Sequence, residues 1–136
     1  VETMDNFLAL RGKAFFLVHP GFGISTPWSY QNLARFPEAY GKAGQAQRLV
    51  EKLKHQDLSA AAVEIFNSLE APAFDKYPVL SLYKEFLREN GALVSLMSGS
   101  GSTTFAIAEN LATAESLAEK FKGRFGDKGW IATVAI

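Results

Sequence analysis

The 136-residue sequence contains no cysteine, and this absence excludes disulfide bonds, thiol catalysis and cysteine-ligated zinc sites. Histidine is nearly absent as well. The two histidines, His19 and His55, are not accompanied by an H-E-x-x-H pattern, so a histidine-based metal site is not expected. We therefore predict no metal site in this chain.

An excess of charge of either sign is also missing. The 14 lysines and arginines balance the 14 aspartates and glutamates, and the net charge is zero. This balance argues against general electrostatic binding to nucleic acid or to an anionic membrane, although a local anion site remains compatible with it. No apolar run is long enough to predict a membrane span, and Val1–Asn6 does not have the pattern of a signal peptide. Because the first residue is not methionine, we expect a processed chain or a piece excised from a longer protein.

What is present fits one α+β domain large enough to fold without a covalent or metal staple. Four β-prone segments are predicted strands: Ala14–His19, which we expect to be buried on both faces, then Ala92–Met97, Phe105–Ala108 and Trp130–Ile136. Five helices are predicted. The first runs from an N-cap at Thr26 to about Arg35, the second covers Ala46–Leu53, and the third runs from a cap at Asp57 to Leu69, with Pro72 as its stop. The fourth runs from Pro78 to a stop at Gly91, and the fifth runs from a cap at Thr113 to Phe125. This order predicts a two-layer sandwich of the split β-α-β (ferredoxin-like) type. Its four-stranded antiparallel sheet carries an enlarged helical insertion after the first strand.

The Ser98–Thr103 loop, between two predicted strands, is the first candidate site. Gly99 and Gly101 can adopt positive φ, so successive amides can turn toward one anion, and Ser98, Ser100, Ser102 and Thr103 add hydroxyl groups. The alternative is a flexible hairpin loop that happens to be rich in glycine and serine. The loop contains no lysine, and no carboxylate lies near enough in sequence to hold Mg²⁺, so it could form only one wall of a phosphate site.

The segment Gly21–Tyr30 is the second candidate. It combines a tight turn, hydroxyl groups at a helix N-terminus and two aromatic residues, Trp28 and Tyr30, which could stack on a planar ring. The alternative, which the residues alone favour, is a capped helix whose aromatic side chains pack into the core.

Asn67 and Glu70 form a third, weaker candidate at the end of a predicted helix. Three residues apart, they can share one helix face and support ligand loops. For Glu70 we favour a solvated helix end instead. His19 is expected to be structural because no partner for catalysis is visible. No base, cationic clamp and metal carboxylate occur together, so no catalytic residue is predicted.

Three blocks of the sequence together resemble the C-terminal domain of the GHMP small-molecule kinases. They are Leu17-Val-His-Pro-Gly21 with Ile24-Ser-Thr-Pro-Trp-Ser-Tyr30, then Phe66-Asn-Ser-Leu-Glu70, and lastly Gly91-Ala-Leu93 with Leu96-Met-Ser-Gly-Ser-Gly-Ser-Thr-Thr-Phe105. The resemblance spans nearly all of residues 1–136. The last block is shared across the superfamily, whereas the block that ends at Tyr30 narrows the resemblance to a single kinase of the non-mevalonate route to isoprenoids.

This resemblance implies ATP-dependent phosphoryl transfer to an alcohol group of a cytidine diphosphate conjugate, in the bacterial cytoplasm. It implies that the Ser98–Thr103 loop lines the active cleft near the phosphates and that Thr26, Pro27 and Tyr30 contact the cytidine part of the substrate. At Ser68, where the family usually has an aspartate, the role of that carboxylate is open.

The family's ATP-binding, catalytic N-terminal domain is absent from these residues. We therefore expect that ATP and Mg²⁺ bind the full-length parent, that this chain alone binds neither and is inactive, and that its main partner is its own N-terminal domain. We also expect an apolar patch where that domain is missing, which could produce a homodimer of the fragment. The alternatives are another GHMP kinase, of the homoserine or mevalonate type, or a non-catalytic α+β binding module.

Overall fold

The computed structural model describes residues 10–41, 43–55, 58–126 and 129–136. The elements, in chain order, are β1 (Ala14–His19), α1 (Thr26–Leu33), η3 (Pro37–Ala39), α2 (Gln45–His55), α3 (Leu58–Ala62), α4 (Glu70–Lys76), α5 (Pro78–Glu89), β2 (Val94–Met97), β3 (Thr104–Ala108), α6 (Leu111–Phe125) and β4 (Trp130–Ala135). Within these ranges, no helix combines the length and the apolar character needed to cross a membrane.

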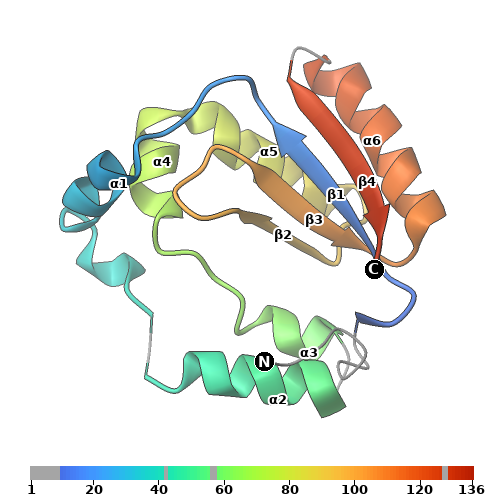
Figure 1. The fold of residues 1–136 in the computed structure, drawn as a ribbon, viewed down its shortest axis with the longest axis horizontal. Helices are drawn as coiled ribbons and strands as arrows, with labels where there is room; N and C mark the ends of the chain where they lie inside the picture. Colours follow the sequence, from blue (N-terminus) through green and yellow to red (C-terminus); the bar gives the residue numbers. More distant parts are fainter. Residues whose placement is uncertain (1–9, 42, 56–57, 127–128) are drawn as a thin grey trace.

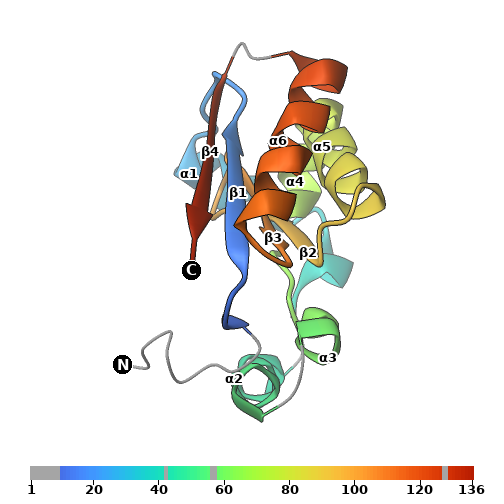
Figure 2. The same ribbon diagram turned by 90° about the vertical axis from the view of Figure 1, so that its right-hand side faces the viewer.

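The four strands form one antiparallel sheet in the order β2-β3-β1-β4. With helices between β1 and β2 and between β3 and β4, this order is the split β-α-β topology. Figure 2 shows the sheet nearly edge-on, with α5 and α6 packed on one side of it. The predicted α+β two-layer architecture, including the helical insertion after the first strand, is therefore confirmed.

The core lies between the sheet and helices α5 and α6. Alternation along β1 directs Phe16 and Val18 toward the helices, where both are buried. Phe121 of α6 packs on Phe16, with ring centroids 5.4 Å apart, and Leu87 of α5 joins the same cluster. This apolar layer fixes the position of both helices on the sheet.

The opposite face of β1 is only partly covered, which corrects the expectation that this strand is buried on both faces. Phe15 lies on that face, half-buried, and its ring meets the edge of Phe105 at 6.0 Å between centroids. On β4, Val134 pairs with Phe15 across the sheet and is 48% exposed, and Trp130 is 58% exposed. Two large apolar side chains are therefore exposed on this face, and the patch for a missing domain stays a prediction.

Helices α2 and α3 lie beyond one end of the sheet, and α1 and α4 lie toward the other (Figure 1). The single helix predicted from Asp57 to Leu69 is wrong in extent: α3 ends at Ala62, and a new helix begins at Glu70. The reason is local. The Asn67 side-chain oxygen accepts a hydrogen bond from the Leu69 amide (3.0 Å), a turn that competes with helix formation. Pro72 lies in the first turn of α4, where proline is tolerated, instead of ending a helix; Asp57 lies outside the described residues.

Two predicted N-caps are each displaced by one to three residues. Ser25, not Thr26, caps α1, because its hydroxyl accepts a hydrogen bond from the Trp28 amide at 3.3 Å. Asn110, not Thr113, caps α6, and its side-chain oxygen accepts from the Thr113 amide at 2.8 Å. In each helix the capping side chain reaches the amide three residues ahead, which is the usual N-cap geometry. Thr26 therefore keeps its hydroxyl free for another contact.

Candidate functional site

The Ser98–Thr103 loop joins β2 to β3 at one end of the sheet, on the side where α1 and α4 lie (Figure 1). The Ser98 amide donates to the Thr103 carbonyl at 2.7 Å, and the Gly101 amide donates to the Ser98 carbonyl at 3.0 Å. Gly99 and Gly101 have φ values of 57° and 99°, the conformations that a turn of this kind requires. The loop is thus a closed turn, and two of its amides are used to hold its own shape.

Some donors in the loop remain available for a ligand. In the part of the chain that the structure describes, the amides of Gly99 and Ser100 donate to no protein acceptor, and the hydroxyl groups of Ser98 and Thr103 have no protein partner. The loop contains no cationic side chain. It can therefore offer hydrogen-bond donors to one side of an anion but cannot neutralise its charge.

The segment before α1 holds the loop from one side. The Ser102 hydroxyl, which is buried, donates to the Phe22 carbonyl. The hydroxyl groups of Thr26 and Ser100 lie 2.9 Å apart in a hydrogen bond that either can donate. The two candidate sites predicted from distant parts of the sequence are therefore in direct contact.

Asn67 and Glu70 hold the loop from the other side. The Asn67 side-chain amide donates to the carbonyls of Met97, at 2.8 Å, and of Gly99, at 2.7 Å. One carboxylate oxygen of Glu70 accepts from the Met97 amide at 2.9 Å, and the other pairs with the Lys84 ammonium at 2.7 Å. The Glu70 side chain is only 12% exposed, so the expectation of a solvated helix end is wrong for this residue.

The residues expected to contact a substrate base lie on α1. Tyr30 is 62% exposed, which shows that it does not pack into the core. Trp28 is half-buried, and the Lys76 ammonium lies 4.6 Å from the centroid of its ring, a cation–π distance. Pro27 is exposed. An exposed aromatic ring on Tyr30 is compatible with stacking, which stays a prediction.

His19 has a structural position, and His55 lies on a helix surface. The Nδ1 atom of His19 accepts a hydrogen bond from the Gly21 amide at 3.0 Å and so stabilises the turn after β1. His55 is largely exposed on α2, 3.7 Å from the Glu51 carboxylate. The described residues contain no group of three or more histidines, cysteines, aspartates or glutamates placed to hold a metal ion.

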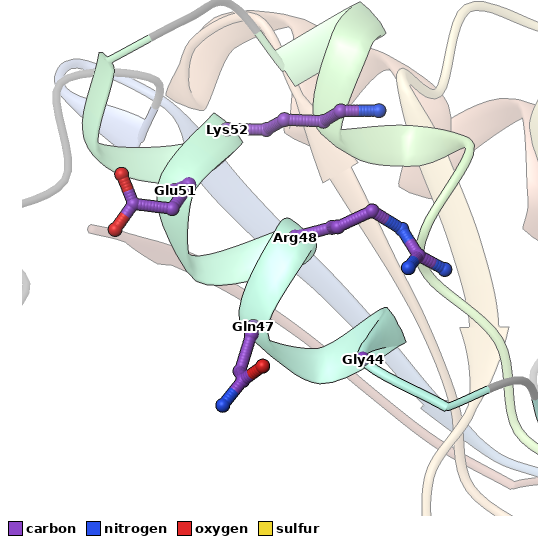
Figure 3. Close-up of a pocket in the computed structure, with 5 residues that line it drawn as sticks. All are labelled: Gly44, Gln47, Arg48, Glu51 and Lys52. Carbon is purple, nitrogen blue, oxygen red and sulfur yellow. The ribbon is translucent and has the colours of Figure 1, made fainter.

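A surface hollow of about 350 Å³ lies away from the loop, along α2 (Figure 3). Its lining residues are Gly44, Gln47, Arg48, Glu51 and Lys52. All five come from one helix and the turn before it, so the hollow is the outer surface of a helix and not a space enclosed by several elements. It contains none of the predicted site residues, and we give it less weight than the loop for that reason.

The two cations beside this hollow are already paired. Arg48 and Lys52 each lie 3.2 Å from the same Glu64 oxygen. Desolvation raises the pKa of Glu64, but the hydrogen bonds and charges of Lys52 and Arg48 outweigh it, and the pKa is lowered overall. These cations stabilise a carboxylate of the protein itself and are not arranged for a ligand.

The fold agrees with the comparisons to known proteins. Residues 49–128 match the family described as GHMP kinases C terminal. Because this match covers more than half of the chain, the chain belongs to the GHMP kinase family as its C-terminal part.

Within that family, the chain is similar to one particular kinase. It is 33% identical, over 124 residues, to 4-diphosphocytidyl-2-C-methyl-D-erythritol kinase of Clostridium perfringens; the aligned region covers 91% of this chain and 42% of that protein. A crystal structure of 4-(cytidine 5'-diphospho)-2C-methyl-D-erythritol kinase matches with a TM-score of 0.69 and 31% identity, covering 95% of this chain and 45% of that one. The chain thus spans less than half the length of these relatives.

The fold is also similar to that of a kinase whose sequence is less similar to this chain. A crystal structure of homoserine kinase from Cytophaga hutchinsonii matches with a TM-score of 0.75 but 20% identity, covering 96% of this chain and 43% of that one. At this identity the match supports the fold only. The sequence relatives, and not this structure, favour the first kinase.

Proposed function

We propose that this chain is the substrate-side domain of an ATP-dependent small-molecule kinase that acts like 4-diphosphocytidyl-2-C-methyl-D-erythritol kinase. The reaction is phosphoryl transfer to an alcohol group of a cytidine diphosphate conjugate, in the cytoplasm. The observation that carries the proposal is the hydrogen bond between Thr26 and Ser100, at 2.9 Å. It joins the segment proposed to receive the cytidine group to the loop proposed to face the phosphates.

In this proposal each group has a limited role. ATP, when bound, supplies the phosphoryl group. The free amides of Gly99 and Ser100 and the hydroxyl groups of Ser98 and Thr103 fit the oxygens of a phosphate, with Gly101 and Ser102 shaping the loop. Tyr30 stacks on the base, and Thr26 and Pro27 line the same position.

The fit does not extend to Mg²⁺. The loop contains no carboxylate, and the described residues contain no cluster of acidic side chains that could bind the ion. The Glu70 carboxylate beside the loop is held by the Met97 amide and the Lys84 ammonium and is not available as a general base. We therefore infer that the metal ligands, the base and the charges that phosphoryl transfer requires come from the protein's own N-terminal domain, and that the chain alone is inactive. The exposed Trp130 and Val134 are compatible with self-association of the isolated fragment.

The test uses the full-length protein and three acceptors: the cytidine diphosphate conjugate of methylerythritol, homoserine and mevalonate. We expect phosphorylation of the first alone. Loss of stacking in Tyr30→Ala should raise the KM for that acceptor by about 5- to 150-fold, the equivalent of about 1–3 kcal/mol. Tyr30→Phe keeps the ring and should leave the KM nearly unchanged.

Two results would contradict the proposal. The first is phosphorylation of homoserine or mevalonate in place of the cytidine conjugate. The second is an unchanged KM in Tyr30→Ala, which would remove Tyr30 from the substrate site while leaving the kinase activity itself in place.

A further inference from the structure

The end of β2 exposes backbone groups that require partners. β2 is an outer strand of the sheet and pairs only with β3. Its last residue, Met97, pairs with Thr104 of β3. The Met97 amide and carbonyl point away from β3 and form hydrogen bonds with the side chains of Glu70 and Asn67 instead. Because the Met97 side chain is almost fully buried, these groups would be costly to leave unpaired.

Asn67 and Glu70 provide both partners. Glu70 accepts from the Met97 amide, and Asn67 donates to the Met97 carbonyl, so the two side chains replace the hydrogen bonds of a further strand. The Asn67 amide group also donates to the Gly99 carbonyl. A single planar group therefore contacts the last residue of β2 and the second residue of the loop, and it fixes the angle between them.

Glu70 is itself held in place from α5. Its second oxygen lies 2.7 Å from the Lys84 ammonium, and the Lys84 carbonyl accepts a hydrogen bond from the Ser95 hydroxyl at 2.9 Å. Lys84 of α5 is thus connected to the Glu70 carboxylate through its side chain and to Ser95 of β2 through its backbone carbonyl. This arrangement restricts the position of Glu70 and, through it, of the loop.

We propose that Asn67 and Glu70 are positioning residues for phosphoryl transfer. They act through Met97 and Gly99 to hold the Ser98–Thr103 loop in the geometry that faces the phosphates, and they do not touch the substrate. The kinetic part of this inference rests on the proposed kinase function. Because a misplaced loop affects the transferring group more than the binding of the acceptor, loss of either residue should lower kcat more than it raises the acceptor KM.

The experiment compares full-length variants by two independent readouts, hydrogen exchange and steady-state kinetics. Asn67→Ala removes both donor contacts, and Glu70→Ala removes the acceptor of the Met97 amide. The control is Glu85→Gln, which changes an exposed carboxylate on α5, next to Lys84. We expect amides of residues 94–105 to exchange about 10- to 100-fold faster in the first two variants, as the loss of a hydrogen bond to a charged or bridging group implies. The kcat should fall by a similar factor, with the acceptor KM changed by less than about threefold. The control should match the wild type in both readouts.

The outcomes are distinguishable. Unchanged exchange over residues 94–105 in both Asn67→Ala and Glu70→Ala overturns the positioning role, whatever the kinetics. Faster exchange with unchanged kcat in an active enzyme also overturns it.

If the wild type phosphorylates none of the acceptors, the proposed function fails, and exchange alone decides whether Asn67 and Glu70 hold the loop. Should slow exchange of the β1 amides be lost, showing that an alanine variant does not fold, Asn67→Asp decides. It keeps the side-chain oxygen that accepts from the Leu69 amide and removes both donors to Met97 and Gly99. Faster exchange over residues 94–105 then supports the proposal, and unchanged exchange overturns it.

Discussion

The helix-covered face of the sheet and the β2–β3 loop are held together by different interactions. On the helix-covered face, the side chains of Phe16, Leu117 and Phe121 are buried in one apolar cluster. The Ser98–Thr103 loop is held by side-chain hydrogen bonds from two separate segments of the chain. Apolar packing is non-directional and stabilises the whole domain, whereas a hydrogen bond fixes the position of particular atoms. The first region should therefore determine stability and the second the geometry of the site.

The largest expected effect is on the helix-covered face. Phe121 is 1% exposed and packs against the rings of Phe16, Tyr83 and Phe125 at centroid distances of 5.4, 4.9 and 4.8 Å. Phe121→Ala should lower the free energy of unfolding by about 3–5 kcal/mol, because it removes buried area and leaves a cavity. Urea denaturation measures this change. Leu111→Ala, at a 38% exposed position of the same helix, should change it by no more than about 0.5 kcal/mol.

An equal loss in the two variants would show that the helix-covered face is not the source of stability. Hydrogen exchange in Phe121→Ala sharpens the comparison. If the amides of β1 exchange faster while those of residues 98–103 do not, the loop is held independently of the core.

An intermediate effect is expected at Gly101. Its φ is +99°, and a Cβ there would lie 2.8 Å from the Ile24 Cδ1 atom and 2.9 Å from the Met97 Sδ atom. Gly101→Ala should therefore cost about 1–3 kcal/mol in the free energy of unfolding and displace the loop from Ile24. The matched control is Gly123→Ala in α6, where a Cβ meets nothing within 4 Å; it should stabilise the protein by about 0.5–1 kcal/mol. If both variants change stability by the same sign and amount, the loop does not need the backbone conformation that glycine allows.

The smallest effect is a pH dependence of the helix-covered face. Burial raises the pKa of the Tyr83 phenol above its ordinary value of 10.0, since the folded state disfavours the ionised form. The resulting stability is fully present below pH 10 and is lost as the pH rises through the raised pKa. Tyr83→Phe should make the urea midpoint fall less steeply above pH 10 than in the wild type, whereas Tyr30→Phe, at an exposed ring, should not alter the slope. Identical slopes in all three proteins would count against the raised pKa of the Tyr83 phenol.

The strands could be predicted from the sequence because their signal is local. The bounds predicted for β1 are the observed ones, and the other three strands differ by at most two residues at an end, since apolar runs between glycine-containing turns depend only on neighbouring residues. The helix from Asp57 to Leu69 failed for an equally local reason, the side-chain turn at Asn67, which periodicity of apolar residues does not reveal.

The contacts of the candidate site are not local, and this limits what the sequence could provide. The loop was identified from its glycines and serines, but Glu70 was assigned to solvent, because its partners Lys84 and Met97 are 14 and 27 residues away. The contact between Thr26 and Ser100 spans 74 residues. The signal that could have suggested a pair of side chains facing another part of the backbone is an asparagine followed three residues later by a carboxylate, Asn67 and Glu70, just before Pro72.

The contacts of Met97 also have a consequence for aggregation. Outer strands are the places where sheets of separate molecules join, because their free amides and carbonyls can recruit another chain. β2 is only four residues long, and at its last residue Asn67 and Glu70 occupy both backbone groups. That edge offers an incoming strand little to pair with. Any strand-to-strand association of this domain is thereby directed to the opposite edge, at β4, where Trp130 and Val134 are exposed.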